Sequence, residues 1–126
     1  MKAKSPEDLL VWQSARQLAI EISAILQQLT AHHEYALSRQ LDAASLSVLA
    51  NISEGFCQPT DRAFANFLYI ARGSNAEVRA LLSVAADRGA LTREALRRLD
   101  PLCDEIARML TSLARYLREQ NRKNRG

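Results

Sequence analysis

Apolar residues recur along this chain at alternating steps of three and four positions, in four segments separated by short polar breaks. This spacing is typical of helices that bury one apolar stripe. The segments predict helices over about residues 6–29, 34–55, 60–88 and 92–121. In the first of them the stripe consists of Val11, Ala15, Leu18, Ile22, Ile25 and Leu29.

Residues that stop or start helices mark the breaks between the segments. Gly55 is placed to end the second helix, and Pro59 blocks its extension. Gly89 is placed to end the third helix, and Thr92 is a candidate N-cap for the fourth. Pro101 interrupts the last stripe, which leaves two alternatives: a kinked helix, or a short helix followed by a long one.

The short breaks force successive helices to run antiparallel. We therefore predict an all-α fold, an up-down-up-down four-helix bundle that forms a single domain over residues 1–126. Several large apolar residues, among them Trp12, Phe67 and Tyr116, lie outside the four stripes. Either the core faces are broad, or a second apolar face is buried by self-association.

The composition agrees with this architecture. Hydrophobic residues make up 48% of the 126 positions, and most of them are alanine and leucine, which favour helices. A chain of this length can bury a core without a disulfide or a structural metal. Cys57 and Cys103 are therefore expected to be free thiols. The sequence has no apolar run that predicts a secretory signal or a membrane span, so we expect a soluble, cytoplasmic protein.

Residues with catalytic or metal-binding chemistry are few. Bundles that hold two metal ions use Glu-x-x-His motifs, which this sequence lacks, and His32 and His33 are adjacent in a predicted loop. Cys103 lies on a core stripe, and no base is assured beside Cys57. The four glycines are isolated, so no phosphate-binding loop is present. These features predict a protein that is not an enzyme and needs no metal or cofactor.

The basic residues are concentrated in the second half of the chain. Residues 64–126 hold twelve basic and seven acidic side chains, against five and seven in residues 1–63. On the fourth helix, beyond Pro101, a basic stripe lies opposite the core stripe. It consists of Arg108, Arg115, Arg118 and Arg122. Lys123 extends it into an expected basic tail of residues 122–126. The stripe predicts phosphate contacts with RNA or DNA, or else is the solvated face that such a helix needs.

Polar residues also lie on or beside the core stripes of the second and third helices. Asn51, Ser74 and Asn75 are expected to form a buried polar network between these helices, because polar groups in a core need hydrogen-bond partners. Glu54 and Glu77 lie away from the stripes. They are candidates to pair with arginines of a neighbouring subunit, or else they face water.

Several motifs together resemble a known family over about residues 9–120. They are Val11-Trp12-Gln13, Glu34-Tyr35-x-Leu37-x-x-Gln40-Leu41-x-x-Ala44, Asn51-Ile52-Ser53-Glu54-Gly55 and Phe64-x-x-Phe67-Leu68-x-Ile70-Ala71-x-Gly73-Ser74-x-x-Glu77. This set resembles the bacterial four-helix-bundle proteins encoded by intervening sequences within 23S ribosomal RNA genes. The same fold group includes the accessory variability protein of diversity-generating retroelements, a basic homopentamer. The resemblance implies an up-down bundle, a homopentamer, and RNA or DNA as a partner.

Two functions from different classes remain open at this point. The first is a non-enzymatic, oligomeric protein that binds nucleic acid through the basic stripe of the fourth helix. The second is an adaptor or scaffold that binds a protein partner, whose charged faces are solvated and whose second apolar face makes the oligomer.

Overall fold

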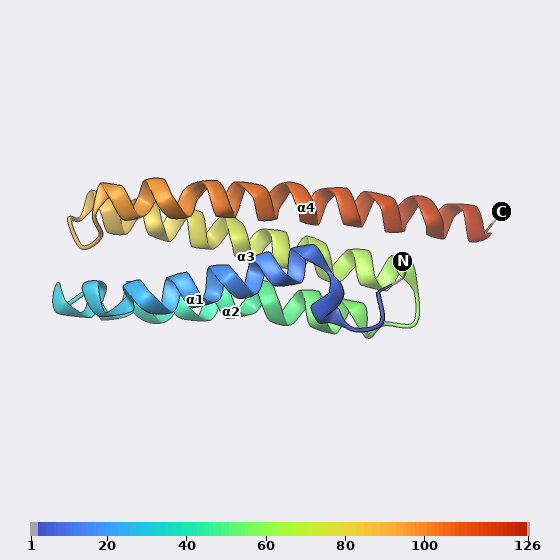
Figure 1. Ribbon diagram of the computed structural model, residues 1–126, viewed down its shortest axis with the longest axis horizontal. Helices are drawn as coiled ribbons and strands as arrows, with labels where there is room; N and C mark the ends of the chain where they lie inside the picture. Colours follow the sequence, from blue (N-terminus) through green and yellow to red (C-terminus); the bar gives the residue numbers. More distant parts are fainter. Residues whose placement is uncertain (1–2, 126) are drawn as a thin grey trace.

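The computed structural model describes residues 3–125, which fold into four α-helices without a strand. After a short 3-10 turn, η1, over Pro6–Asp8, the helices are α1 (Leu10–Ala31), α2 (Tyr35–Phe56), α3 (Asp61–Asp87) and α4 (Arg93–Arg125). Successive helices run in opposite directions along one long axis (Figure 1). The predicted all-α, antiparallel four-helix architecture is confirmed. None of the described helices is long and apolar enough to cross a membrane.

The first helix begins later than the sequence indicated. Pro6–Asp8 form a separate turn, because Asp8 Oδ2 accepts hydrogen bonds from the backbone N–H groups of Lys4 and Ser5 at 2.9 and 3.2 Å. Leu9 then adopts an extended conformation, with φ −80° and ψ 131°, and α1 starts only at the next residue. The single helix predicted from about Pro6 is therefore two elements, the turn η1 and the helix α1.

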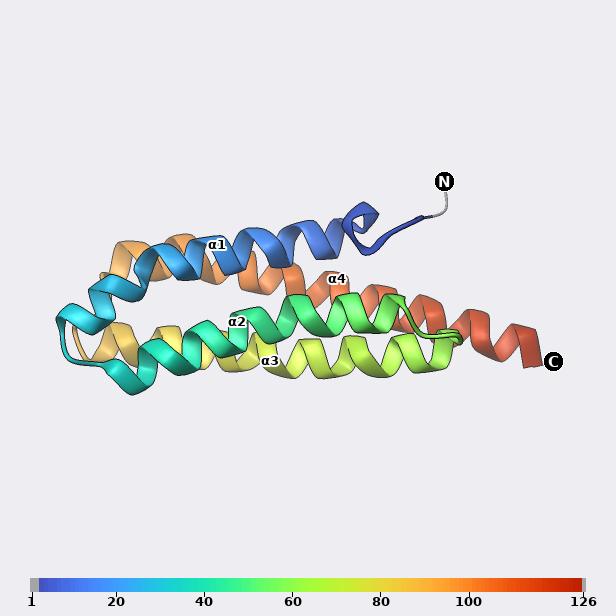
Figure 2. The same ribbon diagram turned by 90° about the horizontal axis from the view of Figure 1, so that it is seen from below.

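The fourth helix is continuous and longer than expected. Pro101 lies inside α4 without dividing it, and residues of the expected basic tail are helical as far as Arg125. An ion pair between Glu119 and Arg122, three positions apart, lies on this last part of the helix, where such pairs favour helix formation. The end of α4 consequently projects past the other helices (Figures 1 and 2).

Local backbone and side-chain contacts set the other helix ends. Thr60 Oγ1 accepts a hydrogen bond from Ala63 N, and Thr92 Oγ1 accepts one from Ala95 N, each at 3.1 Å. Gly89 has a φ of +75° between α3 and α4, which suits glycine. Gly55, by contrast, lies inside the last turn of α2 and does not end it.

The bundle core follows the apolar stripes. All six stripe residues of α1 are at most 4% exposed. The stripes of α3 and α4 are also largely buried, with exceptions on both helices. The spacing of three and four selects Phe64 and Leu113, but these are only half-buried, and the adjacent Ala65 and Ala114 are buried instead. At such positions the facing helix decides which neighbour is buried.

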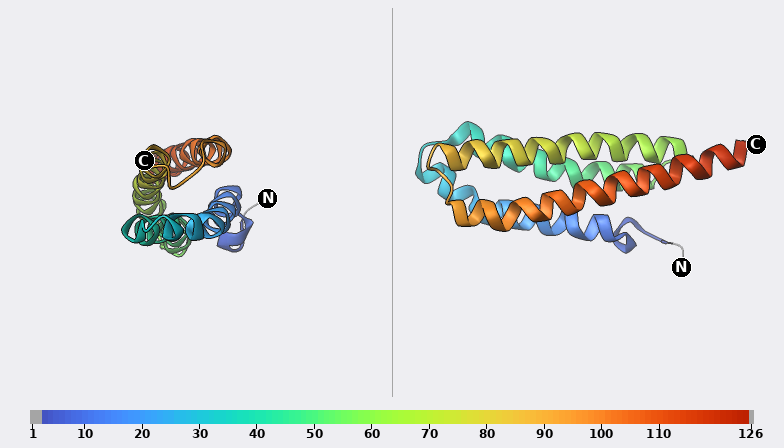
Figure 3. Two further views of the ribbon diagram at one scale, coloured as in Figure 1. Left: turned by 90° about the vertical axis from the view of Figure 1, so that its left-hand side faces the viewer. Right: turned by 90° about the horizontal axis from the view of Figure 1, so that it is seen from above.

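The bundle is closed less tightly between its first and last helices. Contact between α1 and α4 is smaller than between any other pair of neighbouring helices, and Figure 3 shows these two helices at the open side of the bundle. An apolar groove of about 630 Å³ lies there, lined in part by Leu9, Leu10, Met109 and Leu113. Leu10 is 72% exposed at this groove.

Gly55 is needed for the close approach of α2 to α3. A Cβ atom on Gly55 would lie 2.8 Å from both Phe64 Cδ1 and Phe67 Cβ, whereas one on Gly73 would meet no atom within 4 Å. We expect Gly55→Ala to lower the free energy of unfolding by about 1–3 kcal/mol, because α3 must move away. Gly73→Ala should raise it by about 0.5–1 kcal/mol, because alanine is the better helix former.

Urea unfolding followed by circular dichroism, at one fixed protein concentration, measures the free energy of unfolding of both variants and of the unchanged protein. If the two substitutions changed the midpoint in the same direction, the close packing at Gly55 would be contradicted.

Candidate nucleic-acid interface

Basic side chains of α3 and α4 meet at one hollow near the projecting end of α4. The hollow has a volume of about 690 Å³. Its lining residues are Arg62, Tyr69, Arg115, Arg118, Glu119, Asn121 and Arg122. Four guanidinium groups therefore surround this space with a single carboxylate among them. The antiparallel packing of α3 against α4 brings them together, since the start of α3 lies beside the end of α4 (Figure 2).

Most of these arginines are not neutralised by a carboxylate. Within the described residues, Arg62, Arg115 and Arg118 form no ion pair. Arg122 pairs with Glu119, and this hydrogen bond lowers the pKa of Glu119 and raises the pKa of Arg122. Because like charges gather here with little compensation, the hollow is electropositive and suited to an anion.

Tyr69 of α3 contacts one arginine of the hollow, Arg118, and one beside the hollow, Arg72. Arg118 Nη1 donates to Tyr69 Oη at 3.5 Å, and the guanidinium of Arg72 lies 5.0 Å from the centre of the Tyr69 ring. Arg72 Nη1 also donates to Thr111 Oγ1 on α4 at 3.3 Å. The half-buried ring thus holds two arginines in place through a hydrogen bond and a cation–π contact.

The sequence-based site lacked the residues that α3 contributes. Arg62, Tyr69 and Arg72 are spaced by seven and three positions, which places them on one face of a helix. That spacing was visible in the sequence, but only the packing of α3 on α4 joins this face to Arg115 and Arg118.

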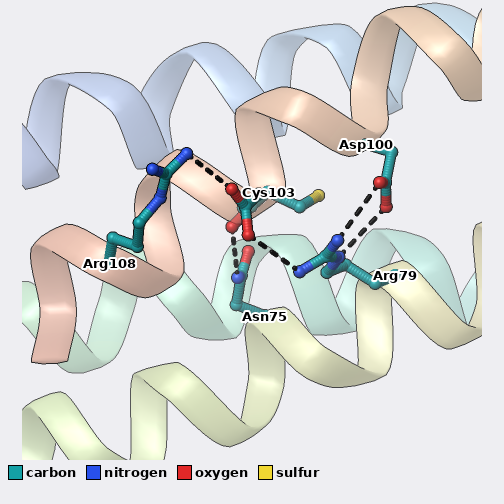
Figure 4. Close-up of polar contacts among 6 residues, drawn as sticks. Asn75, Arg79, Asp100, Cys103 and Arg108 are labelled. Carbon is teal, nitrogen blue, oxygen red and sulfur yellow. Dashed lines mark hydrogen bonds and ion pairs between the residues drawn. The ribbon is translucent and has the colours of Figure 1, made fainter.

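The predicted basic stripe of α4 is divided in the structure. Arg108 lies apart from the hollow and pairs with Asp104 at 2.6 Å. Asp104 also lies 3.6 Å from Arg79 of α3, which donates from Nε and Nη2 to Asp100 at 3.0 and 3.1 Å (Figure 4). This contact with Asp100 raises the pKa of Arg79. Arg108 therefore belongs to a cluster of alternating charges. Lys123, at the other end of the predicted stripe, is exposed and does not line the hollow.

The three polar residues expected to form one network belong to two separate sets. Asn51 Nδ2 donates to the backbone oxygen of Ser47 at 2.8 Å and to its Oγ at 3.1 Å, and Ser47 Oγ lies 2.8 Å from Ser74 Oγ. Asn75 instead donates from Nδ2 to the backbone oxygen of Cys103 on α4 at 2.8 Å (Figure 4). The division arises because successive residues of a helix point about 100° apart.

The remaining candidate residues do not join the hollow. Glu54 and Glu77 are exposed and form no ion pair within the described part of the chain. His32 and His33 are exposed beside the loop, and residues 3–125 contain no group of three potential metal ligands. Burial raises the pKa of the Cys103 thiol to about 11, so it is protonated at neutral pH and is a poor nucleophile.

Fold and charge together define the class of protein: an antiparallel four-helix bundle with an electropositive hollow at one end. The model of the 23S rRNA-intervening sequence protein family matches residues 7–112, and the chain belongs to this family. Arg62 and Tyr69 lie within the matched region, whereas Arg115, Arg118 and Arg122 follow it.

One solved structure of similar fold is the crystal structure of a protein with unknown function from the S23 ribosomal protein family, from Bacteroides thetaiotaomicron. It is 24% identical to this chain and aligns with a TM-score of 0.79, covering 83% of this chain and 98% of that one. The likeness supports the fold of the bundle. Among curated proteins, the comparison finds no match.

The two thiols differ enough to be distinguished chemically. Cys57 is exposed and Cys103 is fully buried. In the native protein at pH 8 we expect one thiol per chain to react with Ellman's reagent, and Cys103 to react at least about a hundredfold more slowly because of its raised pKa and its burial. Cys57→Ser should remove the fast reaction, and guanidinium should release both thiols. Two equally fast thiols in the native protein would contradict the buried position of Cys103.

Proposed function

We propose that this protein is not an enzyme and binds RNA or DNA through the hollow between α3 and α4. The proposal is carried by one observation, the convergence of Arg62, Arg115, Arg118 and Arg122 on a space that holds a single carboxylate. Guanidinium groups form paired hydrogen bonds with phosphate oxygens. The exposure of these arginines leaves them accessible to a nucleic-acid strand.

Contacts of this kind recognise the backbone of a nucleic acid and carry little base sequence information. Arg72 and Lys123 extend the positive surface around the hollow. Arg108 contributes less than the sequence indicated, because Asp104 already occupies its guanidinium. We therefore infer that binding weakens steeply with salt and involves chiefly Arg62 and the last three turns of α4.

We also propose that the protein acts as a homopentamer, as the family resemblance implies. Several large apolar side chains are exposed on the surface of a single chain, which supports self-association. They include Leu10, Ile20, Leu46, Ile70 and Tyr116. Glu54 and Glu77 are exposed on the same helices as Leu46 and Ile70, where they are available to arginines of a neighbouring copy. Each added copy brings another hollow and strengthens binding to a long strand.

The apolar groove between α1 and α4 favours a second candidate function. It offers about 630 Å³ lined largely by apolar side chains, with Leu10 strongly exposed. In this alternative the protein is an adaptor whose groove binds another protein and whose basic surface is only solvated. Recovery of a protein partner that survives nuclease treatment would favour this alternative over nucleic-acid binding.

The arginines of the hollow can be tested with a pair of double variants of equal charge. Arg115→Ala with Arg118→Ala removes two cations from the hollow, whereas Arg16→Ala with Arg39→Ala removes two exposed, unpaired cations from elsewhere in the described chain. We expect the first pair to weaken binding of labelled RNA and DNA about tenfold or more. The slope of the logarithm of the binding constant against the logarithm of the salt concentration should become less steep by about two, because about two phosphate contacts are lost.

Fluorescence anisotropy at increasing salt measures both effects, and the control pair should bind nearly as tightly as the unchanged protein. Equal losses in the two double variants, or no binding at low salt, would contradict the proposal.

The assembly can be tested separately by light scattering. A homopentamer should have about five times the mass of the 14.1 kDa chain. A mass that stays near 14.1 kDa at the concentrations used for binding would contradict the assembly without bearing on the arginines.

A further inference from the structure

The hollow gathers its positive charge around one space instead of spreading it along a line. Arg62 approaches from α3, and Arg115, Arg118 and Arg122 approach from α4. A nucleic-acid backbone carries one negative charge per phosphodiester, so its charges arrive at separate points along a strand. A convergent group of guanidiniums is better matched by a ligand that concentrates several negative charges in one place.

The unpaired arginines make this difference in charge matter. Arg62, Arg115 and Arg118 have no carboxylate partner among the described residues, and only Arg122 shares its charge with Glu119. Asp61, beside Arg62 in the sequence, does not line the hollow. One phosphodiester carries a single negative charge and cannot neutralise three such groups. The directly linked phosphate groups of a diphosphate or triphosphate carry enough negative charge to do so.

We propose that this hollow binds a compact polyphosphate, the terminal diphosphate or triphosphate of a nucleotide. The volume of about 690 Å³ lies within the range of about 300–1,000 Å³ that is usual for small-ligand sites, and it exceeds what one phosphate group fills. The inference rests on the proposed function, because it uses the same surface and narrows its ligand to the charged end of a nucleotide or strand.

Neutral groups in the hollow complete such a site. Tyr69 Oη accepts from Arg118 and keeps its own proton to donate to a phosphate oxygen, and the side chain of Asn121 can also donate. Tyr69 is a positioning residue here, because it orients both Arg118 and Arg72. Glu119 accepts a hydrogen bond from Arg122, and a polyphosphate competes with Glu119 for this guanidinium.

Two sources carry this chemistry, the 5′ end of a triphosphorylated RNA and a free nucleoside triphosphate. Anisotropy with one RNA sequence that bears a 5′-hydroxyl, a 5′-monophosphate or a 5′-triphosphate tests the preference at the strand end. Competition by ATP, AMP and inorganic tripolyphosphate, without divalent cations, tests the free ligand. The variants are Arg62→Ala, Arg118→Ala and Glu119→Gln, with Arg16→Ala as the control.

We expect the 5′-triphosphate RNA to bind at least about tenfold more tightly than the 5′-hydroxyl RNA. Arg62→Ala and Arg118→Ala should bring this ratio of affinities close to one, and Arg16→Ala should leave it unchanged. Glu119→Gln should tighten binding of the 5′-triphosphate RNA. If ATP competes as well as the triphosphate RNA, the polyphosphate is that of a free nucleotide. If ATP competes much more weakly, the site recognises a strand end.

Equal binding of the three RNA ends, with the ratio unaffected by Arg62→Ala, overturns the inference and leaves nucleic-acid binding in place. Binding of tripolyphosphate and ATP without binding of 5′-hydroxyl RNA or DNA supports the inference and contradicts the proposed function. Failure of every ligand to bind at low salt overturns both.

Discussion

The register of α4 against α3 determines where the basic side chains of this protein meet. Asn75, only 1% exposed, donates to the backbone oxygen of Cys103, and Arg79 reaches Asp100 with two parallel hydrogen bonds. A shift of α4 by one turn would move its arginines about 5.4 Å along α3. It would also break the hydrogen bond from the buried amide of Asn75 to Cys103, and a buried donor left without an acceptor costs about 1–3 kcal/mol. The partly exposed Arg79–Asp100 pair contributes less than the apolar core, so these polar contacts chiefly select the register.

The helices themselves follow from the sequence because their apolar stripes repeat within each segment. Every stripe residue of α1 is buried, and antiparallel packing follows from the short loops. The choice between adjacent apolar residues does not follow in this way. Whether Phe64 or Ala65 is buried depends on the facing helix, and the spacing of apolar residues also left open whether α4 continues through Pro101. The fold was predictable to the level of elements and topology, whereas the exact core positions required the partner helices.

The candidate site was predictable only as far as one helix could show it. Arg115, Arg118 and Arg122 lie on α4 and share a face by their spacing alone. The ion pairs that occupy Arg108 and Arg122 involve carboxylates three or four positions away, a signal already present in the sequence. The contributions of Arg62 and Tyr69 could not be found in this way, because they lie more than forty positions earlier and only the α3–α4 contact joins them to α4.

The basic hollow and the bundle core are physically separate, so residues of the hollow can be substituted without changing the core. The arginines of the hollow are exposed and contribute little to the buried core, so their substitution removes charge without opening a cavity. The family match covers the α3 side of the hollow and ends before its three arginines on α4. The residues that assign this chain to its family therefore do not include the three arginines of α4 on which the proposed binding depends. The proposed binding chemistry thus belongs to a site carried by the fold and is not a property of the fold itself.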